Sequence, residues 1–287
     1  MKLDFSVGGT SWRIACEPAR APRTLAAIAA VLPLDLQLHT PKIAGQHIYW
    51  HAPVVQDVEG AIDVMEAPPG AFIYWPARQF LELTFAPLQA ETAAVTLLGR
   101  IEGGLPALQA LGATLRDGHG RAIVSGRLEL AEGEAAPVPP EVQPPADLVA
   151  RRKALWCDSP PEIEGLLASR AIMHPAGPLF LAESEARILH ELLWWVRSGL
   201  ASEPEVVSRR IAAVACNKAA TRLRDFCHLP ESAGLIFDIE TALRGDGALG
   251  PLLDEAILCA GRLAAWLDQR IPWSAVNGAL REVLDAA

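Results

Sequence analysis

The sequence predicts an α+β protein in which a β-rich N-terminal domain precedes an all-α domain. Apolar and polar residues alternate with a period of two up to about residue 131, and beyond residue 148 the apolar period becomes helical. Between these parts, five prolines crowd into a stretch that disfavours regular structure: Pro137, Pro139, Pro140, Pro144 and Pro145. A chain of 287 residues is also long enough for two cores. We therefore predict domains at 1–131 and 148–287, joined by a Pro-rich linker at 132–147.

The N-terminal domain is expected to open with a β-hairpin. Residues Lys2–Val7 and Ser11–Glu17 alternate apolar with polar side chains across Gly8-Gly9. Good helix formers at Leu25–Leu32, stopped by Pro33, predict a helix next. The remaining elements expected in this domain are strands within Leu34–Tyr49, on both sides of Pro76, at Val95–Ile101 and at Arg121–Leu130, with a helix at Leu105–Leu115.

The C-terminal domain is expected to be helical throughout. Polar starts such as Ser184-Glu185 and glycine stops such as Gly199 and Gly245 delimit its periodic segments. We expect the apolar helix that carries Trp194 and Trp195 to pack in the domain core; the alternatives are a dimer interface or a contact with the β domain. The expected helices are Pro161–Arg170, Glu183–Ser198, Glu203–Cys227, Ser232–Leu243, Pro251–Arg270 and Trp273–Asp285.

Composition limits the classes of partner. A net charge of -9, with no long basic block, disfavours nucleic acid. No apolar run approaches the roughly 20 residues of a membrane span, and the first residues lack the features of a secretion signal, so we expect a cytoplasmic protein. The five cysteines are scattered and contain no CxxC pair, which fits reduced thiols.

Glu82 is the main candidate for acid/base chemistry. It stands in a short predicted strand, Phe80–Phe85, after a turn rich in Pro and Gly, and alternation puts Phe80, Glu82 and Thr84 on one face. A carboxyl group in an apolar lining resists ionisation, so its pKa would rise toward the range useful for proton transfer near pH 7. The alternative is that this face meets solvent and Glu82 is an ordinary surface carboxylate.

Arg78 lies in the break between the two strands, next to Trp75 and near Glu82. Its guanidinium group could clamp a substrate carboxylate with two parallel hydrogen bonds. The alternative is a surface arginine without a binding role. Nearby aromatic side chains, Tyr49, Tyr74 and Trp75, are candidates to stack on a substrate ring or to face a cationic intermediate.

His47 and His51 have the spacing of a zinc-binding HxxxH pair, but Ile48-Tyr49-Trp50 between them favours a strand. On a strand they would lie about 13 Å apart, too far for one ion, so we predict no metal site. His51, at the strand end, is the better candidate for a second proton carrier. Gly245–Gly250 matches GxGxxG but follows a helical segment, whereas a dinucleotide fingerprint follows a strand. We therefore expect no cofactor.

Six features of the N-terminal domain recur together in a known order and spacing: the opening hairpin, the helix entered at 21–24, the Ala-Pro-Pro-Gly turn at 67–70, the strands at 73–76 and 82–85, and the Gly-Gly-Leu helix start at 103–105. In this order and spacing, about residues 1–131 resemble the bacterial cyclophilin-like β-barrel family. The helical C-terminal part makes the whole chain similar to the cyclophilin-like Pictet-Spengler enzymes, which include cucumopine-type opine synthases and β-carboline synthases.

The resemblance implies a cofactor-independent Pictet-Spengler cyclase that condenses an amino acid such as tryptophan or histidine with an aldehyde or 2-oxo acid. It also implies a proton-transferring glutamate, which we match to Glu82. Arg78-Gln79-Phe80 only superficially echoes the prolyl isomerase arrangement of arginine, Phe and Gln, so prolyl isomerase activity is disfavoured. The alternatives are a non-catalytic small-molecule binding protein and an assembly role for the Trp-rich helical domain. A homodimer would fit either the cyclase or the binding protein.

Overall fold

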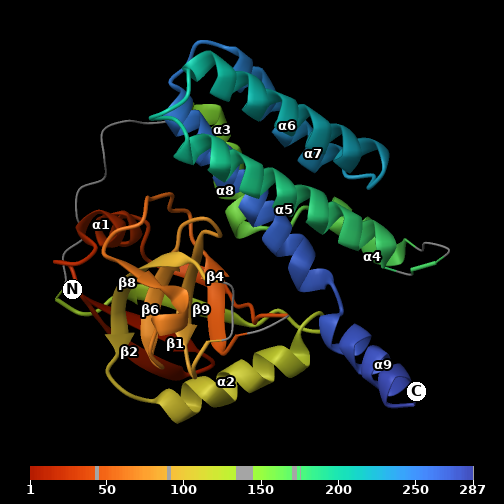
Figure 1. Ribbon diagram of the computed structural model, residues 1–287. Coiled ribbons are helices and arrows are strands. Elements are labelled where there is room, and N and C mark those ends of the chain that lie inside the picture. Colours follow the sequence, from red (N-terminus) through yellow and green to blue (C-terminus); the bar gives the residue numbers. More distant parts are fainter. Residues whose placement is uncertain (43–44, 89–91, 134–144, 170–172, 175, 287) are drawn as a thin grey trace. The chain divides into compact units, whose positions relative to one another are not determined.

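The computed structural model of the chain is shown in Figure 1 and describes residues 1–286 except 43–44, 89–91, 134–144, 170–172 and 175. Most of the predicted linker, 132–147, therefore lies outside the described residues. The chain divides into two compact units. The first comprises residues 1–139 and 272–287, and the second comprises residues 140–271. In this division the last helix belongs with the β-sheet, whereas the sequence analysis assigned it to the helical domain.

The first unit is built on an antiparallel sheet with the strand order β3-β9-β1-β2-β8-β6-β7-β4, to which β5 adds by pairing with β8. Backbone hydrogen bonds between His39, which follows β3, and Tyr49 on β4 nearly close the sheet into a barrel. The strands are β1 (Lys2–Val7), β2 (Thr10–Cys16), β3 (Leu34–Gln37), β4 (His47–His51), β5 (Ala61–Asp63), β6 (Ala71–Trp75), β7 (Phe80–Thr84), β8 (Ala94–Ile101) and β9 (Ser125–Leu130).

Aromatic rings fill the barrel core. The Trp50 ring stacks on Phe5, with ring centroids 5.1 Å apart, and on Phe72, at 6.1 Å. Gly112 lets α2 approach the sheet, because a Cβ atom there would lie 2.4 Å from the Phe85 ring. The helical segments of this unit are α1 (Pro22–Ala30), the 3-10 turn η1 (Val64–Glu66), α2 (Leu105–Gly118) and α9 (Trp273–Asp285).

The second unit consists of helices in its described part. Almost every residue of α8 is buried, including Arg262, which is 2% exposed. The Arg262 guanidinium lies over the rings of Trp156 and Trp266 and donates a hydrogen bond to the Trp156 carbonyl, while burial lowers its pKa to about 9. The helices are α3 (Ala146–Cys157), α4 (Glu162–Ala168), α5 (Gly177–Ser198), α6 (Glu205–Asp225), α7 (Pro230–Arg244) and α8 (Leu249–Arg270).

The predicted fold class, α+β with a cyclophilin-like β-barrel followed by an α-helical domain, is confirmed. The opening hairpin and the later helices also lie where the periodicity put them. Three elements, α3, β5 and η1, were not predicted. Helix α3 carries the charged run Arg151-Arg152-Lys153, which obscures its apolar face, and β5 has only three residues. Helix α5 begins at Gly177 rather than Glu183, with Pro178 in its first turn, a position that proline tolerates.

The expectation that Trp194 and Trp195 pack together in the core is wrong for Trp195. Its side chain is 76% exposed, and Ile188 and Leu192 on the same helix are also exposed. These residues share one side of α5 because they are spaced three and four apart. The helix instead buries Leu189 and Leu193. The second unit therefore leaves part of the apolar surface of α5 uncovered.

No described helix is both long enough and apolar enough to cross a membrane. The five cysteines are free thiols, and three of them, Cys216, Cys227 and Cys259, are buried. Burial raises the pKa of the Cys216 and Cys259 thiols to about 12, so these two groups stay protonated and serve as small core residues.

Candidate functional site

The candidate site lies on one face of the strands β4, β7 and β6. Tyr49 on β4 stands directly opposite Glu82 on β7, and Glu82 stands opposite Ile73 on β6. Residues opposite one another in antiparallel strands share a face, and alternate residues along each strand share it too. His47 and His51, two residues to either side of Tyr49, therefore lie on the same face as Glu82.

Glu82 is fully buried, with 0% of its surface exposed. Burial raises the pKa of its carboxyl group to about 8, although the positive charge of Arg78 acts to lower it. Within the described part of the chain, neither carboxyl oxygen has a hydrogen-bond partner. The predicted rise in pKa is confirmed, and the alternative of a solvated surface carboxylate does not hold. At pH 7 this group is mainly a neutral acid that can donate a proton.

His47 is the side chain that lies beside Glu82. Its Nε2 atom is 3.7 Å from a carboxyl oxygen of Glu82. Burial lowers the pKa of His47 to about 4, and the charge of Lys42 acts in the same direction. Both groups are therefore uncharged near pH 7, and 3.7 Å is too long for a hydrogen bond, so the contact is not an ion pair. His51 was predicted to be a better proton carrier than His47, although strand alternation places both on the face of Glu82.

Tyr49 is held by its neighbours on this face. Its ring stacks on Phe80, with centroids 4.1 Å apart, and on His39, at 5.0 Å. Lys42 donates a hydrogen bond of 2.6 Å to the Tyr49 hydroxyl oxygen. Tyr49 was predicted to stack on a substrate ring, but its ring already stacks on two protein side chains. The Tyr49 hydroxyl group, which accepts a hydrogen bond from Lys42, is the part of this side chain that is suited to a polar contact with a ligand.

His51 is buried at the end of β4. Its ring lies 4.8 Å from Phe80 and 5.7 Å from the ring of His39. His119, just after the end of α2, lies 6.3 Å from the ring of His39. The His39 ring thus neighbours two other imidazole rings, one on β4 and one at the end of α2.

Arg78 and Trp75 lie at the turn that joins β6 and β7. The Arg78 guanidinium carbon is 5.9 Å from the centroid of the Trp75 ring. Trp75 is buried in an apolar cluster that includes Ile73, the residue opposite Glu82. Gln79, between Arg78 and β7, adopts a left-handed backbone with φ of 55°, which is uncommon for a residue other than glycine. The turn thus holds Arg78 near enough to Glu82 to influence its pKa.

Tyr74 lies on the other face of β6. It stands opposite Leu81 rather than Glu82. Its hydroxyl group donates to the Val54 carbonyl at 3.1 Å and accepts from the Gln56 amide at 3.2 Å. Tyr74 was predicted to stack on a substrate ring or to face a cationic intermediate beside Glu82. The strand register places the two residues on opposite faces, and Tyr74 contacts the segment that follows β4.

A polar cavity of about 460 Å³ opens next to this face, within the first unit. Its walls come from the segment between β3 and β4, the end of α2, and α9. Lys42 and His119 line it and also contact the site residues Tyr49 and His39. The cavity is therefore bordered by two side chains that contact the site residues, although neither Tyr49 nor Glu82 is among its lining residues.

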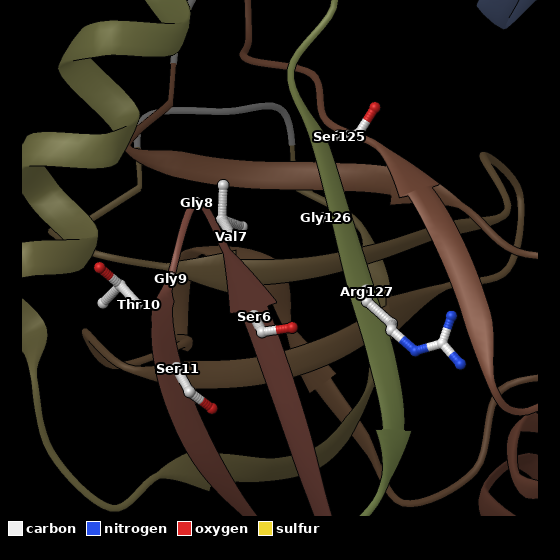
Figure 2. Close-up of a pocket in the computed structure, with 9 residues that line it drawn as sticks. All are labelled: Ser6, Val7, Gly8, Gly9, Thr10, Ser11, Ser125, Gly126 and Arg127. Atoms are coloured by element: carbon white, nitrogen blue, oxygen red, sulfur yellow. The ribbon is translucent and has the colours of Figure 1, made fainter.

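A second hollow, of about 360 Å³, lies at the β1–β2 turn and β9 (Figure 2). Figure 2 shows the side chains of Thr10 and Arg127 pointing in different directions, so they do not converge on one ligand position. The Arg127 guanidinium is already paired with Asp35 at 2.7 Å and Glu129 at 3.0 Å. This hollow is the weaker candidate. Elsewhere, the described residues contain no group of three or more His, Cys, Asp or Glu side chains suited to a metal ion.

Comparison with solved structures shows a similar fold over nearly the whole chain. The structure of McbB in complex with tryptophan superposes with a TM-score of 0.75 at 18% sequence identity, covering 96% of this chain and 99% of McbB. The chain has a fold similar to that of McbB. The hypothetical protein AF2241 from Archaeoglobus fulgidus, at 24% identity, covers 46% of this chain with a TM-score of 0.34, too low to support an argument. No family model and no curated protein matches the sequence.

Proposed function

We propose that this protein is a Pictet-Spengler cyclase that condenses an aromatic amino acid or amine, similar to tryptophan or histidine, with an aldehyde or a 2-oxo acid. The observation that carries the proposal is the pair formed by Glu82 and His47. A buried carboxyl group with a pKa of about 8 lies 3.7 Å from an imidazole that stays neutral. Near pH 7 such a carboxyl group can donate a proton and, once ionised, accept one back, with an uncharged imidazole beside it.

The fold supports the same proposal. McbB, whose fold is similar, has been solved in complex with tryptophan. The barrel face around Glu82 presents aromatic and imidazole rings together with one carboxyl group. These are the groups expected to surround a flat, aromatic amine. The resemblance to β-carboline synthases and to cucumopine-type synthases leaves both tryptophan and histidine as candidate amines.

The proposed reaction begins when the amine nitrogen attacks the carbonyl carbon. Protonation of the resulting hydroxyl group by Glu82 lets it leave as water and gives an iminium ion. The aromatic ring carbon then attacks the iminium carbon, which forms the new C–C bond. The ring carbon loses its proton to the Glu82 carboxylate or, through it, to His47, and aromaticity is restored. The net change is the union of the two substrates less one water.

The predicted binding roles fit this scheme in part. Arg78, at the β6–β7 turn, would bind the carboxylate of the amine partner with a bidentate pair of hydrogen bonds. Trp75 would contact the substrate ring, while the Tyr49 hydroxyl would hold a polar group. His51 would be a second proton carrier. Holding both substrates in one geometry would supply much of the rate enhancement.

Mass spectrometry of reaction mixtures tests the proposal. Purified protein is incubated with tryptophan or histidine and with a panel of aldehydes and 2-oxo acids. A product with the mass of both partners less one water, formed faster than in the protein-free mixture, supports the cyclase. If no pair gives product but tryptophan or histidine binds in calorimetry, the chain is a small-molecule binding protein instead.

We also propose that the chain forms a homodimer through the exposed side of α5. The exposed fractions of Ile188, Leu192 and Trp195 are 43%, 42% and 76%, and they form one row along the helix. A second exposed row lies on α6, at Val207, Ile211 and Val214, with the same spacing. Rows of large apolar side chains are unusual on a monomer, and a two-fold axis would bury each row against its counterpart.

A further inference from the structure

The polar cavity has one wall made by the last helix of the chain. Helix α9 contributes residues spaced so that they share one side of the helix. They are Trp273, Ser274, Asn277, Gly278 and Arg281. The opposite wall comes from the end of α2, which α9 contacts, and from the segment before β4. The end of the chain thus belongs to the surroundings of the Glu82 site.

Positive charge dominates the cavity lining. Lys42, Arg116 and Arg281 come from three separate elements, and Asp117 is the only carboxylate among the lining residues. Neither Arg116 nor Arg281 forms an ion pair with any residue that the structure describes. Both side chains are exposed to solvent at the cavity, so they stay charged and can exchange water for a ligand anion.

The charged cavity is linked to the Glu82 face by two of its lining residues, Lys42 and Gly45. Lys42 donates to the Tyr49 hydroxyl, and Tyr49 stands opposite Glu82. Gly45, also in the cavity wall, approaches so closely that a Cβ atom there would lie 2.7 Å from the His47 ring. Lys42 and Gly45 thus link the cavity to the strand face that carries His47 and Glu82.

We propose that Arg116 on α2 and Arg281 on α9 bind the carboxylate of an acidic carbonyl substrate, and so select a 2-oxo acid over a neutral aldehyde. This inference rests on the proposed cyclase function and specifies its carbonyl partner. Guanidinium groups bind carboxylates with two parallel hydrogen bonds, and two arginines with Lys42 suit an acid that carries a second carboxylate. The carboxylate takes no part in bond formation; only the 2-oxo carbon reacts with the amine and loses its oxygen as water.

Separate cations serve the two substrate acids. Arg78, at the β6–β7 turn, would hold the amine partner, and the cavity cations would hold the carbonyl partner. Glu82 would act where the two partners meet and the iminium carbon forms. A neutral aldehyde would meet the same Glu82 and His47 but would gain nothing from Arg116 and Arg281. The cavity therefore affects selection of the carbonyl substrate rather than the chemistry itself.

Steady-state kinetics of Arg116→Met, Arg281→Met and the double variant test this. Each is assayed with 2-oxoglutarate, pyruvate and acetaldehyde at a fixed, saturating concentration of the amine. We expect KM for 2-oxoglutarate to rise about tenfold in each single variant and further in the double variant, because each change removes one charge-assisted contact. KM for acetaldehyde should change by less than about twofold. Arg100→Met, an exposed arginine on β8 outside the cavity, is the matched control.

The inference would be overturned if the arginine variants lost activity equally with the oxo acids and with acetaldehyde, or if activity with neither changed. Either result would leave the proposed cyclase activity in place. If no carbonyl gives product, the proposed function fails and calorimetry decides the inference separately. The anion site is supported if 2-oxoglutarate binds to the unmodified chain and to Arg100→Met but does not bind to the double variant Arg116→Met/Arg281→Met. Absent binding, or binding that the double variant retains, overturns it. Because both arginines are exposed, folding should survive their replacement, which circular dichroism checks.

Discussion

The Nε2 atom of His47 lies 3.7 Å from a carboxyl oxygen of Glu82, and burial drives the pKa values of these two groups in opposite directions. Taking both groups out of water favours the neutral acid of Glu82 and the neutral base of His47. In an exposed pair the carboxyl group would be ionised at pH 7. This pair is instead poised to exchange a proton with a ligand, which is the property that the proposed chemistry requires.

Replacement of Glu82 by Gln should reduce turnover by about 10²–10⁴-fold, the usual contribution of a general acid/base. Gln is nearly isosteric with a protonated Glu, so binding of the amine should be largely spared. Product formation is measured by mass spectrometry and amine binding by calorimetry. Glu66→Gln, at an exposed position of η1, is the control and should keep full activity. Equal turnover by Glu82→Gln and the unmodified chain would remove Glu82 from the mechanism.

Stability should depend on pH through the same pair. The folded pKa of Glu82, about 8, exceeds its ordinary value of 4.5, so its contribution is complete below pH 4.5 and is lost as pH rises toward 8. The folded pKa of His47, about 4, is below its ordinary 6.5, so stability rises with pH between 4 and 6.5. Below pH 6.5 the effects of Glu82 and His47 on the pH dependence of stability oppose each other. Between pH 6.5 and 8 only the effect of Glu82 remains.

We therefore expect the free energy of unfolding to fall between pH 6.5 and 8, by at most about 1.4 kcal/mol per pH unit. In Glu82→Gln this fall should be absent, and only the rise due to His47 should remain at lower pH. Urea unfolding at a series of pH values measures both curves. The difference between the two proteins cancels contributions from other groups. A difference that stays constant from pH 5 to 8 would show that Glu82 ionises normally in the folded chain.

Gly45 controls the position of His47. Its backbone φ is 121°, and a Cβ atom there would lie 2.7 Å from the His47 ring and 3.1 Å from Pro41. Gly45→Ala should therefore displace His47 from Glu82 and lower kcat, while costing about 1–2 kcal/mol of stability. Gly9→Ala is a matched control, because Gly9 also has a positive φ of 84° but would place its Cβ atom in open space.

Both glycine variants should lose stability in urea unfolding, because both force alanine into a left-handed backbone. Only Gly45→Ala should lose activity, and its His47 resonances should titrate at a changed pH in NMR. Parallel losses of activity in the two variants would mean that strain, and not the position of His47, is responsible.

The sequence predicted the properties of the site that depend on a single strand. Alternation in β7 put Glu82 on a face with Phe80 and Thr84, and the apolar setting implied a raised pKa. The pairing of Glu82 with His47 depends on the register between β4 and β7, which are far apart along the chain. Tyr74 illustrates the same limit, because it is close to Glu82 in sequence but faces the other way. Local periodicity fixes which residues share a face, whereas register decides which faces meet.

The helices show the same limit of sequence-based prediction. Their periodicity and most of their ends were visible in the sequence. The sequence did not indicate which surface each apolar side of a helix packs against. Helix α9 groups with the barrel rather than with the preceding helices, and the apolar side of α5 that carries Trp195 is left exposed. A repeating apolar pattern predicts burial of that side but does not name the partner, which can be the same unit, another unit or another molecule.

Trp195 gives the sharpest test of the proposed homodimer. Trp195→Glu puts a charge at the most exposed large side chain of the α5 row, and burying a charge at an apolar interface is strongly unfavourable. We expect light scattering to give the mass of a dimer for the unmodified chain and of a monomer for the variant. Phe226→Glu, an exposed aromatic residue at the end of α6 and outside both rows, should remain dimeric. A monomeric unmodified chain would exclude the homodimer, and a Trp195→Glu variant that stays dimeric would locate the interface elsewhere.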